Sequence, residues 1–505
     1  HWQLVEEKAL SRLLAAKMVE ETLAAAALTA TLMVEATLQG GNLENNLESA
    51  GVSGSTAAGF NYSAAASHFG TENVDDLDND DYDNYVVSSR VGYDFTEDMS
   101  LSIILRYQYA EAGVPGPTQF LPEDPDDELD SEQIVFTALF DQQFTDWWGH
   151  SVQASYFTQD LEQKDPLSQD PLFINDFVSD YDAEFDRMAV DYHQNFTIFD
   201  AHVLTFGTAW EQEEADIVSV SDFGFGPSTD IVDKQRRNLA FYGQASFSFW
   251  ERLDLLAGVR YDDNSVFGTE VSPRLAASYL VRETGTRLKG SYGEAIKNPS
   301  FLDLYYPFFG NPDLEPEESE AWDVGVEQTL WDGRVRAGIT YFQADFDNLI
   351  VFAFPAPQNI GTAESEGVEL ELTALLPYHL TFRGAYTYTE AEDGDGHRLI
   401  RIPKHLLSLN LNYDYQRLSL NMNATIVSER PDSAFVDFDG DFVNDITDDE
   451  ANGYVKLDVA GEYRLTEHLW LTGRVENLLD DEHFEEALGF ENPGISFLAG
   501  VRGVF

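Results

Sequence analysis

One unit recurs along nearly the whole of this sequence: about ten residues in which apolar and polar side chains alternate, followed by a turn. In "RLDLLAGVRYD" (residues 252–262), Leu253, Leu255 and Val259 share one face of a strand, whereas Asp254 and Arg260 share the other. Because successive side chains of a strand point to opposite faces, each unit predicts a strand with one apolar and one polar face. We count about 22 such strands between residues 29 and 505, which predicts a single all-β architecture over that range.

The connections between these strands alternate in length. Tight turns such as "FTED" (95–98) and "WDG" (331–333) alternate with long loops that are acidic or rich in proline. These loops lie at 110–131, 161–182, 217–233, 296–318 and 429–453. Short turns on one rim and long loops on the other are the arrangement of an outer-membrane barrel. No run of about 18 apolar residues is present, so no transmembrane helix is expected. Because helices and closed barrels are the structures that span bilayers, a membrane protein with this sequence is expected to be a barrel. We predict a transmembrane antiparallel β-barrel of about 22 strands, with aromatic girdles and a lumen that needs a plug.

The composition fits that fold and argues against one class of partner. The chain has no cysteine and 13% aromatic residues, as expected of a barrel that folds outside the cytosol without disulfides. Its formal net charge is -62, so the basic surface of a nucleic-acid-binding protein is absent and no nucleic acid is expected as a partner. We interpret most of the acidic excess as solvated surface and assign divalent cations to particular loops.

Four segments carry a family resemblance. They are "GSYGEAIKNPSFLDLYYPFFGNPDLEPEESEAWDVGVEQ" (290–328), "NIGTAESEGVELEL" (359–372), "RIPKHLLSLNLNY" (401–413) and "GRVENLLDDEHFEE" (473–486). In this order they resemble the TonB-dependent outer-membrane receptors, and within that family they most resemble the vitamin B12 and siderophore branch. The C-terminal Phe505 is similar to the aromatic residue by which such barrels are recognised for assembly.

The resemblance implies an outer-membrane receptor of a Gram-negative cell that takes up a scarce ligand, such as a siderophore, a corrinoid or a similar nutrient, with force from an inner-membrane complex. The implied partners are the small-molecule ligand, outer-membrane lipid and lipopolysaccharide, the barrel-assembly machinery, and the TonB complex if a plug is present. A plugless passive pore, or a structural component of an outer-membrane assembly, is the alternative. Haem receptors of this family place a His within the region that corresponds to Lys297–Leu314, which here contains none.

Residues 1–28 precede the first expected strand. Leu10, Leu14 and Met18 recur at helical spacing, which predicts a short helical segment. The family resemblance implies a folded plug of well over a hundred residues at this place, and no plug motif is found. Three explanations stay open: a plug deleted and replaced by a helix, a plug supplied by a separate chain, or residues of uncertain identity.

Aromatic residues in the long loops are the candidate ligand contacts, although membrane-interface girdles use the same residue types. These residues are Tyr305, Tyr306, Phe308, Phe309, Phe435 and Phe438. The carboxylates Glu315, Glu317, Glu318 and Glu320, which follow in "PEESE", are expected to form a solvated rim.

The loop "VDFDGDFVNDITDDE" (436–450) is a candidate calcium site. Asp437, Asp439, Asp441 and Asp445 surround Gly440 at a spacing at which alternate carboxylates can converge on one ion. The bidentate Glu at position twelve of an EF-hand is absent, and the solvated interpretation stays equally open. In a second acidic loop, "DDLDNDDYDN" (75–84), solvation is favoured.

Other kinds of chemistry find no support. The ten histidines are scattered without a pair at ligand spacing, so no transition-metal centre is expected. No nucleophile elbow of the G-x-S-x-G kind is present, and an enzyme is the least favoured class.

Overall fold

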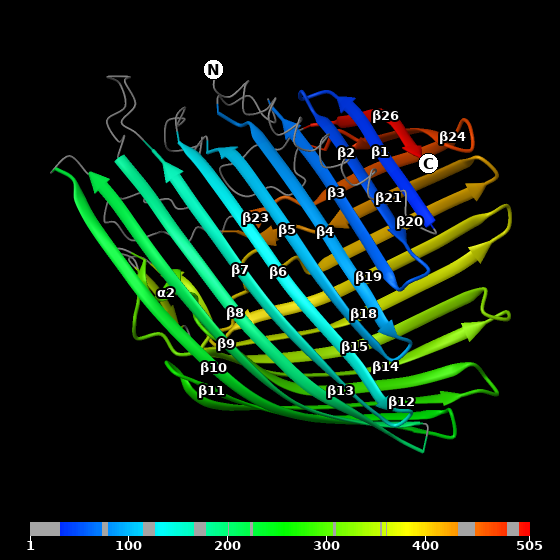
Figure 1. The fold of residues 1–505 in the computed structure, drawn as a ribbon, viewed down its shortest axis with the longest axis horizontal. Coiled ribbons are helices and arrows are strands. Elements are labelled where there is room, and N and C mark those ends of the chain that lie inside the picture. The colour runs from blue at the N-terminus through cyan, green and yellow to red at the C-terminus, as the bar shows by residue number, and fades with distance from the viewer. Residues whose placement is uncertain are drawn as a thin grey trace.

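The structure, a computed structural model, describes residues 31–72, 79–114, 127–165, 178–199, 201–222, 226–306, 310–353, 356–359, 361–432, 450–481 and 494–505. Within these residues, 22 strands form one antiparallel sheet that closes on itself (Figure 1). The strands are β1 (Thr31–Gly41), β2 (Asn46–Ser55), β3 (Phe60–Thr71), β4 (Tyr82–Thr96), β5 (Met99–Gly113), β6 (Glu128–Thr145), β7 (Trp148–Lys164), β8 (Val178–Ile198), β9 (His202–Asp222), β10 (Ser228–Phe249), β11 (Leu253–Asn264), β12 (Gly268–Val281), β13 (Thr286–Lys297), β14 (Glu317–Leu330), β15 (Val335–Asp347), β18 (Thr362–Leu376), β19 (Leu380–Asp393), β20 (His405–Tyr415), β21 (Leu418–Val427), β24 (Tyr454–Arg464), β25 (Leu469–Glu476) and β26 (Ser496–Val504).

The barrel closes where the two ends of the sheet meet. β1 pairs with β2 on one side and with β26 on the other. At the seam, the amide of Val34 donates to the carbonyl of Phe505 and the amide of Phe505 donates to the carbonyl of Val34, each at 2.8 Å. Closure leaves no open sheet edge, and the predicted 22-stranded antiparallel barrel is confirmed.

The register lines up the apolar faces of neighbouring strands. Residues directly opposite one another in a ladder lie on the same face. One apolar row runs across nine consecutive strands through Leu253, Tyr279, Leu288, Val326, Ile339, Leu370, Tyr386, Leu407 and Ile426. The adjacent row on the opposite face holds Asp254, Ser278, Lys289, Gly325, Thr340, Glu369 and Thr387. The alternation read from the sequence therefore separates a lipid-facing belt from a polar lumen.

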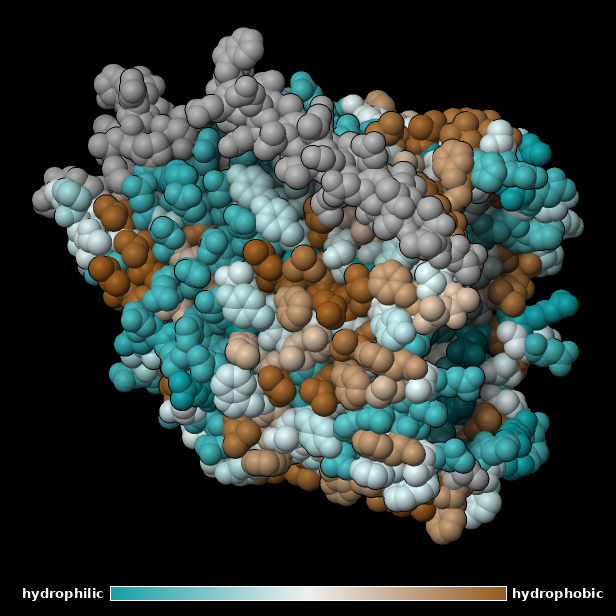
Figure 2. Space-filling model, in the orientation of Figure 1, coloured by the Kyte–Doolittle hydropathy of each residue, from teal (hydrophilic) through white to brown (hydrophobic). Residues whose placement is uncertain are grey.

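The two rims differ as the sequence predicts. The short turns carry exposed aromatic side chains: Trp147, Trp250, Trp331 and Tyr378 are 53%, 77%, 70% and 84% exposed. These positions suit an aromatic girdle at a membrane interface. Figure 2 shows many brown and white residues across the middle of the barrel face, and teal residues toward both the left and the right of the view.

Three small elements lie in the long loops. They are the helix α2 (Phe301–Tyr305), the hairpin of β16 (Ile350–Ala353) and β17 (Ala356–Asn359), and the short pair β22 (Arg430–Pro431) and β23 (Glu450–Ala451). In the described part of the chain, no helix has the length and apolar character needed to cross a membrane. The helical segment predicted for residues 1–28 lies outside the described residues.

The loop predicted at 217–233 is largely strand, and the loop predicted at 161–182 overlaps strands at both ends, so these predicted loop bounds were wrong. The loops expected at 161–182 and 217–233 are shortened because β7 runs to Lys164, β8 begins at Val178, β9 runs to Asp222 and β10 begins at Ser228. The ladder between β9 and β10 continues unbroken to the pair Ser221 and Ser228. β8, β9 and β10 consequently form a wall on the long-loop side.

Candidate functional site

The loop between β13 and β14 carries the helix α2, whose start is fixed locally. Ser300 is the N-cap: its side chain accepts a hydrogen bond from the amide of Asp303 at 3.0 Å, while Asp303 Oδ2 accepts from the amide of Ser300 at 2.9 Å. This reciprocal pair satisfies two amides that a helix start otherwise leaves free. Pro299, just before the cap, is fully buried. The stretch "NPSFLD" therefore determines where the helix begins.

The helix packs against the lumen face of β8, β9 and β10 (Figure 1). The contact surface consists of Tyr181, Ala183 and Ile217, which are 5%, 0% and 0% exposed. Leu302 and Tyr306 of the loop pack against this surface, together with Phe185 and Val232 of the wall and Leu161 of β7. Since the loop starts at β13 but packs on β8 to β10, it turns inward over the mouth of the lumen.

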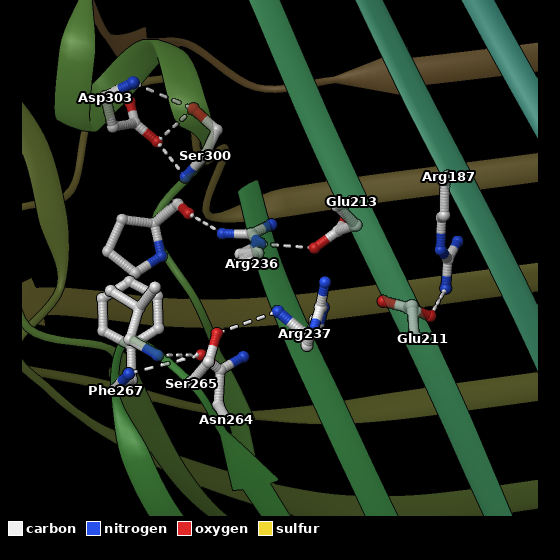
Figure 3. A network of polar contacts seen from close by, with 12 residues as sticks. Arg187, Glu211, Glu213, Arg236, Arg237, Asn264, Ser265, Phe267, Ser300 and Asp303 are labelled. Atoms are coloured by element: carbon white, nitrogen blue, oxygen red, sulfur yellow. Dashed lines mark hydrogen bonds and ion pairs between the residues drawn. The ribbon is translucent and has the colours of Figure 1, made fainter. Parts of the chain in front are cut away.

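Arg236, on β10, joins the wall to the loop. Its Nη1 donates to the carbonyl of Pro299 at 2.6 Å, and its Nε donates to Glu213 of β9 (Figure 3). The guanidinium also lies over the ring of Phe301, 4.7 Å from the ring centroid. The Arg236 side chain is only 12% exposed. A planar guanidinium with several donors suits such a junction, because it can bind a carboxylate, a carbonyl and a ring face at once.

Tyr305 and Tyr306, two of the predicted ligand contacts, end the helix beside the same wall. Lys234 Nζ lies 5.1 Å from the ring centroid of Tyr305, and the rings of Tyr306 and Tyr181 are 5.7 Å apart. Burial raises the pKa of the Tyr306 phenol. A cavity of about 510 Å³ opens here, lined among others by Asp230, Val232, Lys234, Leu304, Tyr305 and Tyr306.

The second half of the loop is braced by the β16–β17 hairpin. Asn311 Nδ2 donates to the carbonyl of Pro357 at 2.9 Å. The side chain of Asn359 accepts from the amide of Glu315 and donates to the carbonyl of Glu315, each at 3.0 Å. These side-chain contacts explain the phrase "GNPDLEPE", because its residues hold two neighbouring long loops together.

Glu317 belongs to this brace, which corrects the prediction that it lies on a solvated rim. It is 8% exposed, and its carboxylate accepts from the amide of Ile350 at 2.7 Å and from Lys297 Nζ at 2.8 Å. A carboxylate can be buried at low cost when two donors satisfy it. Glu315 and Glu318 are exposed, as predicted.

Deeper in the lumen, Tyr242 of β10 forms a strap across β9. The ring crosses Gly207, directly opposite in the register, and its hydroxyl donates to both oxygens of Asp191 on β8, each at 2.9 Å. Asp191 also lies 3.0 Å from Nδ1 of His193. A side chain at position 207 would occupy the space of the ring, since an added Cβ would lie 2.2 Å from Tyr242 Cζ.

The structure does not test the remaining predicted site residues. Phe308, Phe309, Phe435, Phe438, Asp437, Asp439, Asp441 and Asp445 lie outside the described residues, so their roles stay predictions. Across the described ranges, no three His, Cys, Asp or Glu side chains are grouped so that they could hold a metal ion.

Sequence reasoning missed the wall residues that receive the loop, above all Arg236, Lys234 and Tyr181. Alternation places all three on the lumen face. Alternation could not show that these residues contact the loop between β13 and β14, which begins three strands further along the chain.

The chain resembles known proteins in both sequence and fold. Residues 34–478 match the family model described as "TonB dependent receptor-like, beta-barrel". The chain is 28% identical over 355 residues to the vitamin B12 transporter BtuB of Photobacterium profundum, covering 66% of this chain and 53% of that protein. With the same transporter of Vibrio vulnificus it shares 28% over 306 residues, covering 59% and 46%. The chain thus spans about half the length of the curated relatives it matches.

Two solved structures illustrate the likeness in fold. The copper transporter OprC superposes with a TM-score of 0.79 at 15% identity, covering 94% of this chain and 81% of that one. The ferripyoverdine receptor of the outer membrane of Pseudomonas aeruginosa, bound to ferripyoverdine, superposes with a TM-score of 0.78 at 17% identity, covering 94% and 72%. At these identities the likeness concerns the fold alone.

Proposed function

This chain belongs to the family of TonB-dependent receptor-like β-barrels, and on that premise we propose that it forms the barrel of a receptor that imports a scarce ligand. As a closed 22-stranded barrel of this family, it lies in the outer membrane of a Gram-negative cell. The ligand class is a siderophore, a corrinoid or a similar nutrient. The names of the relatives, a vitamin B12 transporter and a ferripyoverdine receptor, support this class.

One observation carries the proposal: the loop with α2 folds into the mouth of the lumen and holds Tyr305 and Tyr306 beside a cavity of about 510 Å³. Aromatic side chains near a few charged groups are typical of small-molecule sites. A passive pore needs no such surface at its mouth, whereas a receptor does. The driving force is assigned to an inner-membrane TonB complex, which the family membership supports.

Uptake by whole cells tests the receptor against the passive pore. Cells that lack their own corrinoid receptor would express this protein and receive radiolabelled cyanocobalamin, with a ferric siderophore in a parallel assay. A receptor should show saturable uptake of one of the two that a protonophore abolishes. A pore would give uptake that rises linearly with concentration and persists with the protonophore, and that result would refute the proposal.

Calcium binding by Asp437, Asp439, Asp441 and Asp445 is part of the proposal. It is supported by the spacing of these carboxylates around Gly440, since calcium takes six to eight oxygen ligands that alternate residues of a tight loop can supply.

A further inference from the structure

Arg236 differs from the neighbouring arginines of the lumen in what it binds. Arg187 of β8 pairs with Glu211 of β9, and Arg260 pairs with Asp262 of the same strand, β11, so the ion pairs of both arginines lie within the barrel sheet. Arg236 pairs with Glu213 of the wall and also donates to Pro299 of the loop. Its side chain is 12% exposed, against 54% for Arg187 and 42% for Arg260. Among these three arginines, Arg236 is the buried link between wall and loop.

We propose that Arg236 is a positioning residue for the ligand-contact surface, because it holds residues 299–306 against the wall and so places Tyr305 and Tyr306 beside the cavity. The ligand-contact role of these tyrosines rests on the proposed function, whereas the holding of the segment does not. Arg236 acts through the loop and does not itself line the cavity.

The contacts of β10 explain why one side chain can position the whole segment. Arg236 holds the residues at the start of α2, through the carbonyl of Pro299 and the ring of Phe301. Lys234, two residues earlier on the same face, lies beside Tyr305 at the end of the helix. One strand therefore fixes both ends of α2.

Loss of the guanidinium would leave two groups without their donor. The carboxylate of Glu213 would lose its Arg236 partner, and the Pro299 carbonyl would lose its donor beside a fully buried ring. An unsatisfied buried polar group is costly, and the cost is relieved when water reaches it. Lifting of α2 from the wall admits that water, so removal of Arg236 should favour the lifted state.

A buried thiol can report this motion without any ligand. The chain has no cysteine, so Leu304→Cys, at a position only 2% exposed on α2, would supply its only thiol. In otherwise unchanged protein this thiol should react slowly with a maleimide. Arg236→Gln should raise the labelling rate by about 10- to 100-fold, as expected for loss of a charge-assisted hydrogen bond. Arg236→Lys, which keeps the charge but not the planar donors, should give an intermediate rate.

Two matched variants make the test specific. Arg260→Gln removes a lumen-facing arginine of the next strand that is also paired with a carboxylate, and it should leave the labelling of Leu304→Cys unchanged. Leu314→Cys, 4% exposed in the half of the loop braced by β16–β17, should label equally slowly with and without Arg236. Heat-modifiable migration on SDS gels confirms that each barrel is closed. Fast labelling of Leu304→Cys in the presence of Arg236, an unchanged rate in Arg236→Gln, or an equal acceleration by Arg260→Gln would overturn the proposal.

The ligand experiment is kept separate. In the uptake assay, Arg236→Gln should raise the concentration of cyanocobalamin or ferric siderophore needed for half-maximal uptake about tenfold or more. If the unmodified protein takes up neither probe, the proposed function fails while the labelling result still decides the role of Arg236. If uptake is saturable but identical in Arg236→Gln, the positioning role fails and the receptor function stands.

Discussion

Replacement of Gly207 by alanine should break the strap that Tyr242 forms across β9. The ring lies directly over Gly207, and an added Cβ would stand 2.2 Å from Cζ and 2.4 Å from the hydroxyl oxygen. Both distances are far below van der Waals contact, so either the ring or the backbone of β9 has to move. If the ring moves, the hydroxyl loses its bonds to Asp191, which are 2.9 Å long.

The expected loss of stability combines two terms. Overpacking of a filled site costs about 1–3 kcal/mol. A hydrogen bond to a charged group contributes about 1.5–3 kcal/mol. Gly207→Ala should therefore lower the free energy of unfolding by about 2.5–6 kcal/mol, and Tyr242→Phe, which removes only the hydrogen bond, by about 1.5–3 kcal/mol. Denaturant titration of the barrel in phospholipid vesicles measures both values.

A variant that lacks the Tyr242 ring tests whether the loss of stability comes from the clash with that ring or from any side chain at this position of β9. With Tyr242→Ala in place, Gly207→Ala should be nearly neutral, since the alanine then fills space that the ring has left. Gly258→Ala is the control glycine on β11, because the nearest atom to its added Cβ lies at an ordinary 3.5 Å. A cost of Gly207→Ala that persists in the Tyr242→Ala background, or one below about 0.5 kcal/mol with Tyr242 present, would refute the reasoning.

Three further outcomes are expected. Calcium at a hundredfold excess over its dissociation constant should stabilise the folded protein by about 2.7 kcal/mol and protect the 429–453 loop from protease. The double variant Asp439→Asn with Asp441→Asn should abolish both effects. If calcium has no effect on the unchanged protein, these carboxylates are solvated surface residues and not a calcium site. Glu317→Gln should speed amide exchange at Ile350 about tenfold, because the amide loses a charged acceptor at 2.7 Å, whereas Glu318→Gln, at an exposed neighbour, should not. Deletion of Phe505 removes two seam hydrogen bonds of 2.8 Å and should lower the yield of heat-modifiable barrel; Phe505→Ala keeps both bonds and isolates the contribution of the ring.

The strands could be predicted because apolar and polar residues alternate within each strand. The strand register then aligns the apolar residues of neighbouring strands around the barrel. The same rule failed on the extensions of β9 and β10. On the lumen face, apolar Ala215 and Ile217 are followed by Ser219 and Ser221, while Val218 lies on the opposite face. The apolar side of the alternation thus changes face within one strand. A sequence pattern reads such a change as the end of the strand, although the backbone ladder continues.

The candidate site could be predicted only in part. Tyr305 and Tyr306 were identified as aromatic residues of a long loop, and the structure places both beside a cavity. Their supports come from residues far away in sequence, such as Arg236 for Pro299 and Asn359 for Glu315. The helix α2 has five residues, too few for a helical period to show. Neither a long-range pairing nor a single helical turn leaves a periodic trace in the sequence.

The seam between β1 and β26 also has a consequence for the order of events during biogenesis. The seam joins the first and the last strand of the barrel in sequence order, β1 and β26. Until β26 pairs with β1, a partly assembled sheet has outer strands with unpaired backbone groups, and such edges readily pair with other chains. The contact that ends this exposure joins opposite ends of the barrel sequence, which makes it intrinsically slow to find. During assembly of the barrel, β1 therefore needs protection until β26 pairs with it.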